Sequence, residues 1–367
     1  MKVKMEPNNK FGESLESKNG ELNKVSSDTE IQIKHLHNTK EKNENKSENI
    51  NYNKPEAEKF FDSKNEFEPT NQNDNHTNLA SSLSISNKVE DEKYIFKKVA
   101  CFENSTKNIY VFNTLENKIS KVTLDLPNLD IKKLESYHSS LNYKDMFYIS
   151  GGINKNAKMF YRYDMENQKL TKLKDMINGH SYHALCSYSN IIFAISGFKS
   201  KKCERYSIEN NVWIPLPDIA FSRSMPSCTV IQDKIYIFAG YDDISRKCID
   251  IIERYDLSKP NSTSWETINL KLDEGFPFYS GLISLTNELL FIGGKNLIDS
   301  EPCKSVWMFK KTEHILEKTN NTILNNDEFD GKNFVLIGEN KYGMFSSIFP
   351  NTFIIYEKDQ FFKEIYN

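Results

Sequence analysis

The sequence lacks the segments that would carry a protein out of the cytosol. Its 367 residues contain no apolar run that approaches the roughly 18 residues of a membrane-spanning helix. Residues 1–7 (MKVKMEP) have no apolar stretch of the kind that forms the core of a signal peptide. We therefore expect a cytoplasmic protein that does not insert into a membrane.

A strong charge of either sign is also missing. The chain has 48 Lys and Arg residues against 51 Asp and Glu residues, which gives a formal net charge of -3 at pH 7. Proteins that bind nucleic acids usually carry a concentrated positive charge that matches the phosphate backbone. We therefore expect no nucleic-acid partner.

Cysteine is scarce, and no two of the six cysteines form a Cys-x-x-Cys pair. We interpret them as buried thiols that pack as small apolar groups. His180, His183 and Cys186 stand three residues apart, a spacing that could gather metal ligands on one face of a helix. The segment precedes a predicted strand, however, and alternation would send His183 and Cys186 to opposite faces. The sequence therefore predicts no metal site and no other cofactor.

Motifs of known catalytic machinery do not occur either. The sequence has no P-loop, no dinucleotide-binding glycine pattern and no motif that pairs a nucleophile with a base. We therefore identify no catalytic residue, and we expect the protein not to be an enzyme. The remaining evidence lies in composition and in repeated patterns.

Residues 1–93 have the composition of a disordered tail. They contain no Trp, no Cys and few aliphatic residues, and are dominated by Asn, Lys, Glu and Ser. Such a segment cannot bury enough apolar surface to offset the conformational entropy that is lost on folding. We therefore divide the chain into a disordered polar tail, residues 1–93, and a folded domain, residues 94–367.

One short segment of this tail stands apart from the rest. Phe60, Phe61 and Asp62 lie within residues 56–66 (EAEKFFDSKNE), where acids flank two adjacent aromatic residues. In a disordered chain such residues can act as a docking motif, although a chance pair of aromatics is the alternative. The three residues resemble the acidic two-phenylalanine motif that tethers cytosolic proteins to receptors on the endoplasmic reticulum, and neighbouring positions depart from it.

The folded part repeats one pattern of short strands. Four runs rich in Ile, Phe and Tyr end at glycine, which is typical of buried strands that finish in a sharp turn. In each repeat a later strand carries an aromatic residue, and these six positions fall 43 to 54 residues apart along the chain. A period of about 50 residues suits a four-stranded unit of a repeat architecture.

These positions, with Glu204-Arg205-Tyr206 and Glu253-Arg254-Tyr255, resemble kelch repeats of a β-propeller. The resemblance covers about residues 95–367. It implies an all-β, kelch-type β-propeller of six four-stranded blades, preceded by the disordered tail. The resemblance assigns a structural role to Gly151, Gly152, Tyr163, Gly197, Tyr206, Trp213, Gly240, Tyr255, Trp265, Gly293 and Gly294.

Function is expected on the loops at one end of the blades. In a four-stranded antiparallel blade, the loops that join the second strand to the third and those that join successive blades emerge on the same face. Aromatic and Arg residues on a rigid exposed face favour protein interfaces. The predicted partner-binding residues are Tyr182, Phe198, Lys201, Arg223, Tyr241, Arg246 and Phe276. For Phe276 the alternative is that it leads into the next strand and is buried there, without contacting a partner.

We therefore expect a non-catalytic scaffold or adaptor that binds a protein partner, such as a cytoskeletal or ubiquitin-ligase component. Two alternatives stay open. Some kelch propellers are substrate receptors of ubiquitin ligases, although residues 1–93 show no helical pattern for an adaptor domain. Others are enzymes, such as copper oxidases of the galactose oxidase type and sugar mutarotases. A copper site would need Tyr and His ligands, and the folded part has four His residues.

Overall fold

The structure, a computed structural model, describes residues 94–103, 106–125, 138–153, 157–259, 262–269, 280–294, 303–322, 334–346, 351–357 and 360–365. The predicted tail with Phe60, Phe61 and Asp62 lies outside these residues, as does Phe276. The described residues are all-β and contain no helix.

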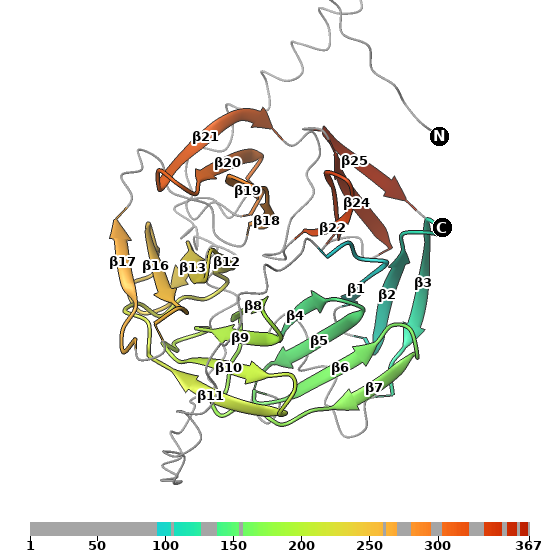
Figure 1. The fold of residues 1–367 in the computed structure, drawn as a ribbon, viewed down its shortest axis with the longest axis horizontal. Helices are drawn as coiled ribbons and strands as arrows, with labels where there is room; N and C mark the ends of the chain where they lie inside the picture. The colour runs from blue at the N-terminus through green and yellow to red at the C-terminus, as the bar shows by residue number, and fades with distance from the viewer. Residues whose placement is uncertain are drawn as a thin grey trace, which may run out of the picture. The chain divides into compact units, whose positions relative to one another are not determined.

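Six antiparallel sheets stand around a central axis as the blades of a propeller (Figure 1). Blade 1 holds β1 (Lys98–Phe102), β2 (Asn108–Asn113) and β3 (Lys118–Thr123); blade 2 holds β4 (His138–Tyr143), β5 (Met146–Gly151), β6 (Phe160–Asp164) and β7 (Lys169–Lys172). Blade 3 holds β8 (Ala184–Tyr188), β9 (Ile191–Ile195), β10 (Cys203–Ser207) and β11 (Val212–Leu216).

The other three blades complete the ring. Blade 4 holds β12 (Ser227–Ile231), β13 (Lys234–Phe238), β16 (Ile251–Asp256) and β17 (Glu266–Asn269), and blade 5 holds β18 (Gly281–Ser284), β19 (Glu288–Ile292), β20 (Ser305–Lys310) and β21 (Ile315–Thr322). Blade 6 holds β22 (Val335–Gly338), β23 (Lys341–Phe345), β24 (Thr352–Glu357) and β25 (Gln360–Ile365). A separate two-stranded hairpin, β14 (Tyr241–Asp242) with β15 (Lys247–Cys248), extends from blade 4.

Apolar side chains fill the spaces between neighbouring blades, so the inner strands are buried on both faces. This explains why β13 and its equivalents are nearly continuous runs of Ile, Tyr and Phe. The ring closes by the same kind of packing, because Val99, Cys101 and Phe112 of blade 1 share a cluster with blade 6. Within that cluster the rings of Phe112 and Phe353 stack with centroids 4.0 Å apart. Blades 1 and 6 share no described strand, and the packing of these side chains connects them.

Blade 1 departs from the four strands that were predicted, because its described residues form three. Among the described residues no fourth strand pairs with the inner edge of β1, and residues of blades 2 and 6 bind the backbone there. The side-chain amide of Asn142, on β4 of blade 2, accepts a hydrogen bond from the N–H of Ala100 at 2.8 Å and donates to its carbonyl oxygen at 2.9 Å. On the other side, the N–H of Phe96 donates to the carbonyl oxygen of Leu336 in β22 at 2.8 Å. These bonds satisfy backbone groups that an inner strand would otherwise pair.

Two of the repeated aromatic residues, Trp213 and Trp265, bind the segment that follows the preceding blade. Trp213 on β11 donates its indole N–H to the carbonyl oxygen of Lys174 at 3.0 Å, just after blade 2. Trp265, which precedes β17, donates in the same way to the carbonyl oxygen of Pro217 at 2.7 Å, just after blade 3. Tyr163, Tyr206 and Tyr255 are buried, and the rings of Tyr206 and Tyr255 lie against those of Trp213 and Trp265. These two residues therefore connect blade 3 to blade 2 and blade 4 to blade 3.

Candidate partner-binding face

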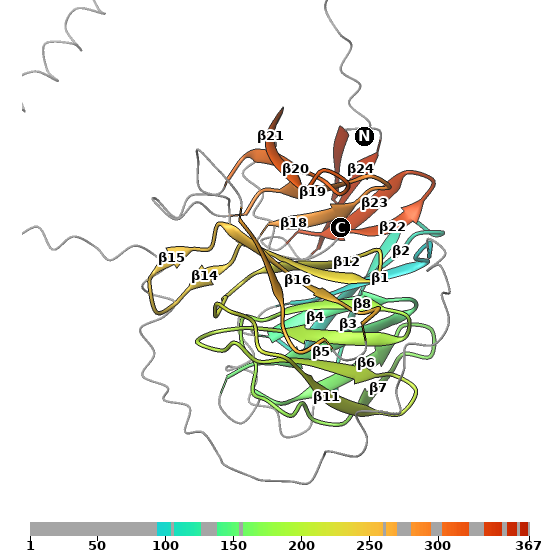
Figure 2. The same ribbon diagram turned by 60° about the vertical axis from the view of Figure 1, so that its left-hand side comes forward.

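The loops predicted to share one face are joined by hydrogen bonds. We call this surface the hairpin face; it comprises residues 177–183, 197–202 and 219–226 and the β14–β15 hairpin. The N–H of Phe198 donates to the carbonyl oxygen of Ser181, and the N–H of Met225 to that of Tyr182, each at 2.8 Å. Figure 2 shows the hairpin projecting from the edge of the propeller. The loops of blades 3 and 4 thus form one connected surface.

The loop that enters blade 3 is fixed by His180. Its Nδ1 lies 2.7 Å from the carbonyl oxygen of Ser196, and its Nε2 lies 2.9 Å from Oε1 of Glu204. Glu204 also accepts hydrogen bonds from the N–H groups of Ile177 at 2.9 Å and Asn178 at 3.1 Å. His180 and Glu204 are fully buried. Because a buried carboxylate is costly without partners, this arrangement holds the loop firmly to the blade.

The loop that enters blade 4 is fixed by Arg223. Its Nε and Nη2 donate to Oε2 of Glu253 at 3.1 and 2.8 Å, and its Nη1 donates to the carbonyl oxygens of Ala239 at 2.8 Å and Ile251 at 2.9 Å. Glu253 also accepts a hydrogen bond from the N–H of Ala220. Burial lowers the pKa of the guanidinium, and the charge of Glu253 opposes that shift.

The two anchors occupy equivalent places in successive blades. Ser196 and Ala239 each stand immediately before the glycine that follows the second strand, and both have left-handed backbones, with φ of 62° and 51°. Glu204 and Glu253 each stand before the Arg-Tyr pair of the third strand. A histidine in one blade and an arginine in the next therefore hold the interblade loop in the same way.

The β14–β15 hairpin is attached to the loop at residues 219–226. Tyr241 and Ser224 exchange two backbone hydrogen bonds of 2.8 Å. Asp242 accepts hydrogen bonds from the hydroxyl of Ser222 at 3.0 Å and from the N–H groups of Ile244 and Ser245, each at 3.2 Å. Asp242 therefore shapes the turn of the hairpin and is turned toward the protein.

Asp243 connects three parts of the hairpin face. Its Oδ2 accepts hydrogen bonds from the N–H of Lys199 at 3.1 Å and the hydroxyl of Ser224 at 2.7 Å. Its Oδ1 is buried, with no hydrogen-bond partner among the described residues. Burial raises the pKa of this carboxyl to about 6, and the charge of Asp242 adds to the rise, while the two hydrogen bonds oppose it. The ionised form is therefore poorly accommodated.

The predicted partner-binding residues divide into exposed and buried groups. Lys201 and Arg246 are exposed, and Phe198 is half-buried with Nζ of Lys199 located 5.1 Å from its ring centroid. Tyr182, Tyr241 and Arg223 are buried.

Arg223 is fully buried because Glu253 and two carbonyl groups surround its guanidinium. In this structure it supports the face from below, and a partner at the surface would not reach it.

Sequence reasoning did not select two apolar residues that lie at the surface of the hairpin face. Phe221 is 40% exposed and Ile244 is 73% exposed. Ile244 stands between the polar residues Asp243 and Ser245, which is the signal that could have identified it; Phe221 stands between Ala220 and Ser222. Large exposed apolar side chains are typical of interfaces when they gather on one rigid surface.

A serine and a histidine also meet near this face. The Oγ of Ser150 lies 2.8 Å from Nε2 of His183. Ser150 is fully buried and His183 is 5% exposed, and Nδ1 of His183 has no hydrogen-bond partner among the described residues. A catalytic pair needs access to substrate and a third group that orients the base. This geometry therefore fits an internal hydrogen bond.

The two histidines considered as possible metal ligands form hydrogen bonds inside the protein, His180 with Glu204 and His183 with Ser150. Within the described part of the chain, no group of three or more His, Cys, Asp or Glu side chains could hold a metal ion.

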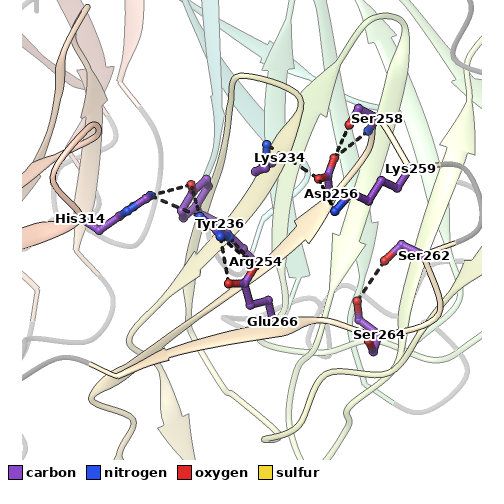
Figure 3. Close-up of polar contacts among 10 residues, drawn as sticks. All are labelled: Lys234, Tyr236, Arg254, Asp256, Ser258, Lys259, Ser262, Ser264, Glu266 and His314. Carbon is purple, nitrogen blue, oxygen red and sulfur yellow. Dashed lines mark hydrogen bonds and ion pairs between the residues drawn. The ribbon is translucent and has the colours of Figure 1, made fainter.

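A second polar cluster lies at the turn of β20 and β21, where blades 4 and 5 meet (Figure 3). Nε2 of His314 lies 3.2 Å from the hydroxyl of Tyr236 and 3.3 Å from Nη1 of Arg254. Arg254 also forms two hydrogen bonds with Glu266, at 2.8 and 2.9 Å. Desolvation, and then the charge of Arg254, lower the pKa of His314. The neutral imidazole can accept a hydrogen bond from Arg254, so the cluster joins the two blades.

A kelch motif is matched by residues 222–268, which hold both Arg223 and Glu253 and the whole hairpin. The chain belongs to the kelch-repeat family. The prediction from the repeated glycine and aromatic positions is thereby confirmed, together with the six-bladed propeller. A kelch propeller suggests a role in protein–protein interaction.

The kelch relatives are matched over part of their length. Over 130 residues the chain is 30% identical to a RING finger domain and kelch repeat-containing protein of Dictyostelium discoideum, which covers 33% of this chain and 13% of that protein. It is 28% identical over 133 residues to Kelch-like protein 36 of Rattus norvegicus, covering 32% and 22%. It is 25% identical over 190 residues to Kelch repeat and BTB domain-containing protein 2 of Cowpox virus (strain GRI-90 / Grishak), covering 48% and 32%.

No described helix is long and apolar enough to cross a membrane.

Proposed function

We propose that this kelch propeller is a non-catalytic scaffold or adaptor that binds a protein partner through the hairpin face. We also propose that the folded domain begins near residue 94 and that the protein is cytoplasmic. The partner would contact Phe221 and Ile244, with Lys201 and Arg246 at the rim. Phe198 would lie at the margin of this surface, and the buried anchors would hold the loops in place.

The observation that carries this proposal is the exposure of Phe221 and Ile244 on loops that are attached to the blades through the contacts described above. The two side chains are 40% and 73% exposed, whereas the loops that bear them are attached through buried Arg223 and through Asp242. Phe221 stands on the loop that buried Arg223 fixes, and a rigid surface loses little conformational entropy on binding, so an apolar anchor there contributes strongly to affinity. The cations beside them would favour a partner with acidic groups around an apolar contact.

The test compares two variants of the full chain as affinity baits in cell extract. The face variant carries Phe221→Ser, Lys201→Glu, Ile244→Ser and Arg246→Glu. The control variant carries Leu115→Ser and Lys118→Glu, which change an exposed leucine and lysine at the β2–β3 turn. Tyr241 stays unchanged because it is buried and its loss would affect folding.

Proteins captured by the wild type and by the control variant, yet depleted at least about tenfold with the face variant, would support the proposal, since a hot-spot residue contributes about 2 kcal/mol or more. Melting temperatures must agree, because exposed substitutions usually change stability by less than about 0.5 kcal/mol. Equal capture by a correctly folded face variant would overturn the proposal and direct attention to Phe60 and Phe61.

A second candidate function is that of a substrate receptor in a ubiquitin ligase. The observation that favours it is the RING finger in the name of the Dictyostelium discoideum relative. The matched region covers 13% of that protein, so the likeness concerns the kelch part. Recovery of ubiquitin-ligase subunits with the same wild-type bait would support this role, and their absence from captures that retain other partners would contradict it.

A further inference from the structure

We propose that the carboxyl group of Asp243 is a pH-dependent latch that holds the β14–β15 hairpin against the neighbouring loops when protonated and releases it when ionised. This inference rests on the proposed function, because the hairpin carries Ile244 and Arg246 of the hairpin face. It adds regulation to that surface: the arrangement of the binding side chains would depend on one buried carboxyl group.

The latch joins three segments through one side chain. Asp243 belongs to the hairpin that extends from blade 4, and its Oδ2 receives the N–H of Lys199 from the loop of blade 3 and the hydroxyl of Ser224 from the interblade loop. When the hairpin moves away, both contacts are lost together. The carboxyl group is therefore placed where its charge affects the attachment of the hairpin.

The surroundings of Asp243 oppose its charge more than they support it. The charge of the Asp242 carboxylate, on the same hairpin, disfavours ionisation of Asp243, and the ammonium group of Lys199 provides partial compensation from the loop of blade 3. The ionisable residue of the interblade loop, Arg223, is bound to Glu253. The buried Oδ1 receives no hydrogen bond from the described residues, so an ionised carboxyl gains from a movement that admits water.

The hairpin is small enough to move without unfolding the blade. Its strands pair through two residues each, Tyr241 with Cys248 and Asp242 with Lys247. Apart from these pairs and Asp243, it is held by the backbone bonds between Tyr241 and Ser224, by the bond from the N–H of Ile249 to the carbonyl oxygen of Gly240, and by the hydroxyl of Ser222, which donates to Asp242 at 3.0 Å. A short two-stranded hairpin is marginally stable alone, and such elements open locally while the core remains intact.

The direction of the pH effect follows from the raised pKa. Because the closed hairpin raises the pKa of Asp243 from 3.8 to about 6, the closed form binds the proton more tightly than the open form. Closure is therefore favoured below the pKa of the open form and weakens as the pH rises through about 6. Over the whole titration, a shift of this size corresponds to a change of roughly 100-fold in the ratio of closed to open hairpin.

Hydrogen exchange of the full chain, followed by mass spectrometry between pH 5 and pH 8, tests the latch without any partner. Protection of the amides in residues 241–249 is corrected for intrinsic exchange and divided by that of β13 in the same blade. In the wild type this ratio should fall by up to about tenfold from pH 5 to pH 8. In Asp243→Asn, which cannot ionise, the ratio should stay constant. Asp218→Asn, at an exposed ion pair with Lys202, should behave as the wild type.

A constant ratio in the wild type, or the same fall in Asp243→Asn, would overturn the latch. If Asp243→Asn fails to fold, the carbon-13 resonance of the wild-type Asp243 carboxyl decides: a midpoint near 6 supports the inference and one below 4 contradicts it. Neither measurement involves binding, so a failed latch leaves the interface proposal intact. Loss of the interface proposal would likewise leave a measured hairpin movement standing.

Discussion

Arg223 and Glu253 form a fully buried ion pair, with Nη2 of the arginine 2.8 Å from Oε2 of the glutamate. The pair lies beneath the loop that carries Phe221, and the same guanidinium binds two carbonyl oxygens of blade 4. The surface loop therefore owes its position to a charge that solvent does not reach. His180 and Glu204 do the same beneath the preceding loop.

Removing one partner of the Arg223–Glu253 pair should strongly destabilise the propeller. Glu253→Ala leaves a buried guanidinium without its counter-charge, and such losses cost about 3 to 5 kcal/mol. Urea unfolding followed by tryptophan fluorescence would measure the free energy of unfolding. Glu266→Ala, which breaks a partly exposed pair with Arg254, should cost less than about 1 kcal/mol. Equal losses in the two variants would contradict the importance assigned to the buried pair.

Gly197 and Gly338 should respond differently to a methyl group. Gly197 has φ of 129°, and a Cβ there would lie 2.5 Å from the carbonyl oxygen of Ser181. Gly338 has no comparable strain, because the nearest atom to its Cβ would be 3.5 Å away on Lys341. Gly197→Ala should therefore destabilise the protein by about 1 to 3 kcal/mol more than Gly338→Ala. Thermal unfolding of both variants is the measurement, and similar melting temperatures would refute the conformational role of Gly197.

Asn142 should stabilise blade 1 beyond its contribution to packing. Asn142→Ala removes both hydrogen bonds to Ala100 and exposes the inner edge of β1, which should cost about 1 to 3 kcal/mol. Hydrogen exchange should then accelerate at the Ala100 amide more than at the amides of β13. Asn142→Asp retains the acceptor for the Ala100 N–H but loses the donor, so the exchange at that amide should change less. Unaltered exchange at Ala100 in the alanine variant would contradict this function.

Acid should destabilise the fold partly through His183. Desolvation, with the charges of His180 and His138, holds the pKa of His183 well below its ordinary value of 6.5. The folded chain keeps this imidazole neutral while the unfolded chain takes up a proton below about pH 6.5, so the contribution is present above that pH and is lost as the pH falls. His183→Gln should therefore show a smaller decrease in the free energy of unfolding between pH 7 and pH 5, by up to about 1.4 kcal/mol per pH unit. An identical slope in both proteins would contradict the prediction.

The sequence alone determined the repeat and much of the architecture. Glycines at the ends of apolar runs and aromatic residues 43 to 54 positions apart predicted the six blades, because turn geometry and strand alternation are properties of nearby residues. The buried positions of Tyr163, Tyr206 and Tyr255 follow from the same repeat. These features could be predicted because each requires only a short segment of chain.

Only the tertiary structure decided which loop residues reach the surface and how blade 1 is completed. Arg223 was predicted at an interface and is buried, because its partner Glu253 stands 30 residues away and packing brings the two together. Phe221 and Ile244 are exposed because neighbouring loops leave them uncovered. The side chain of Asn142, 42 residues from Ala100 in the sequence, forms the hydrogen bond that a neighbouring strand would otherwise provide. Long-range packing and hydrogen bonding set these positions, and local sequence patterns alone do not fix them.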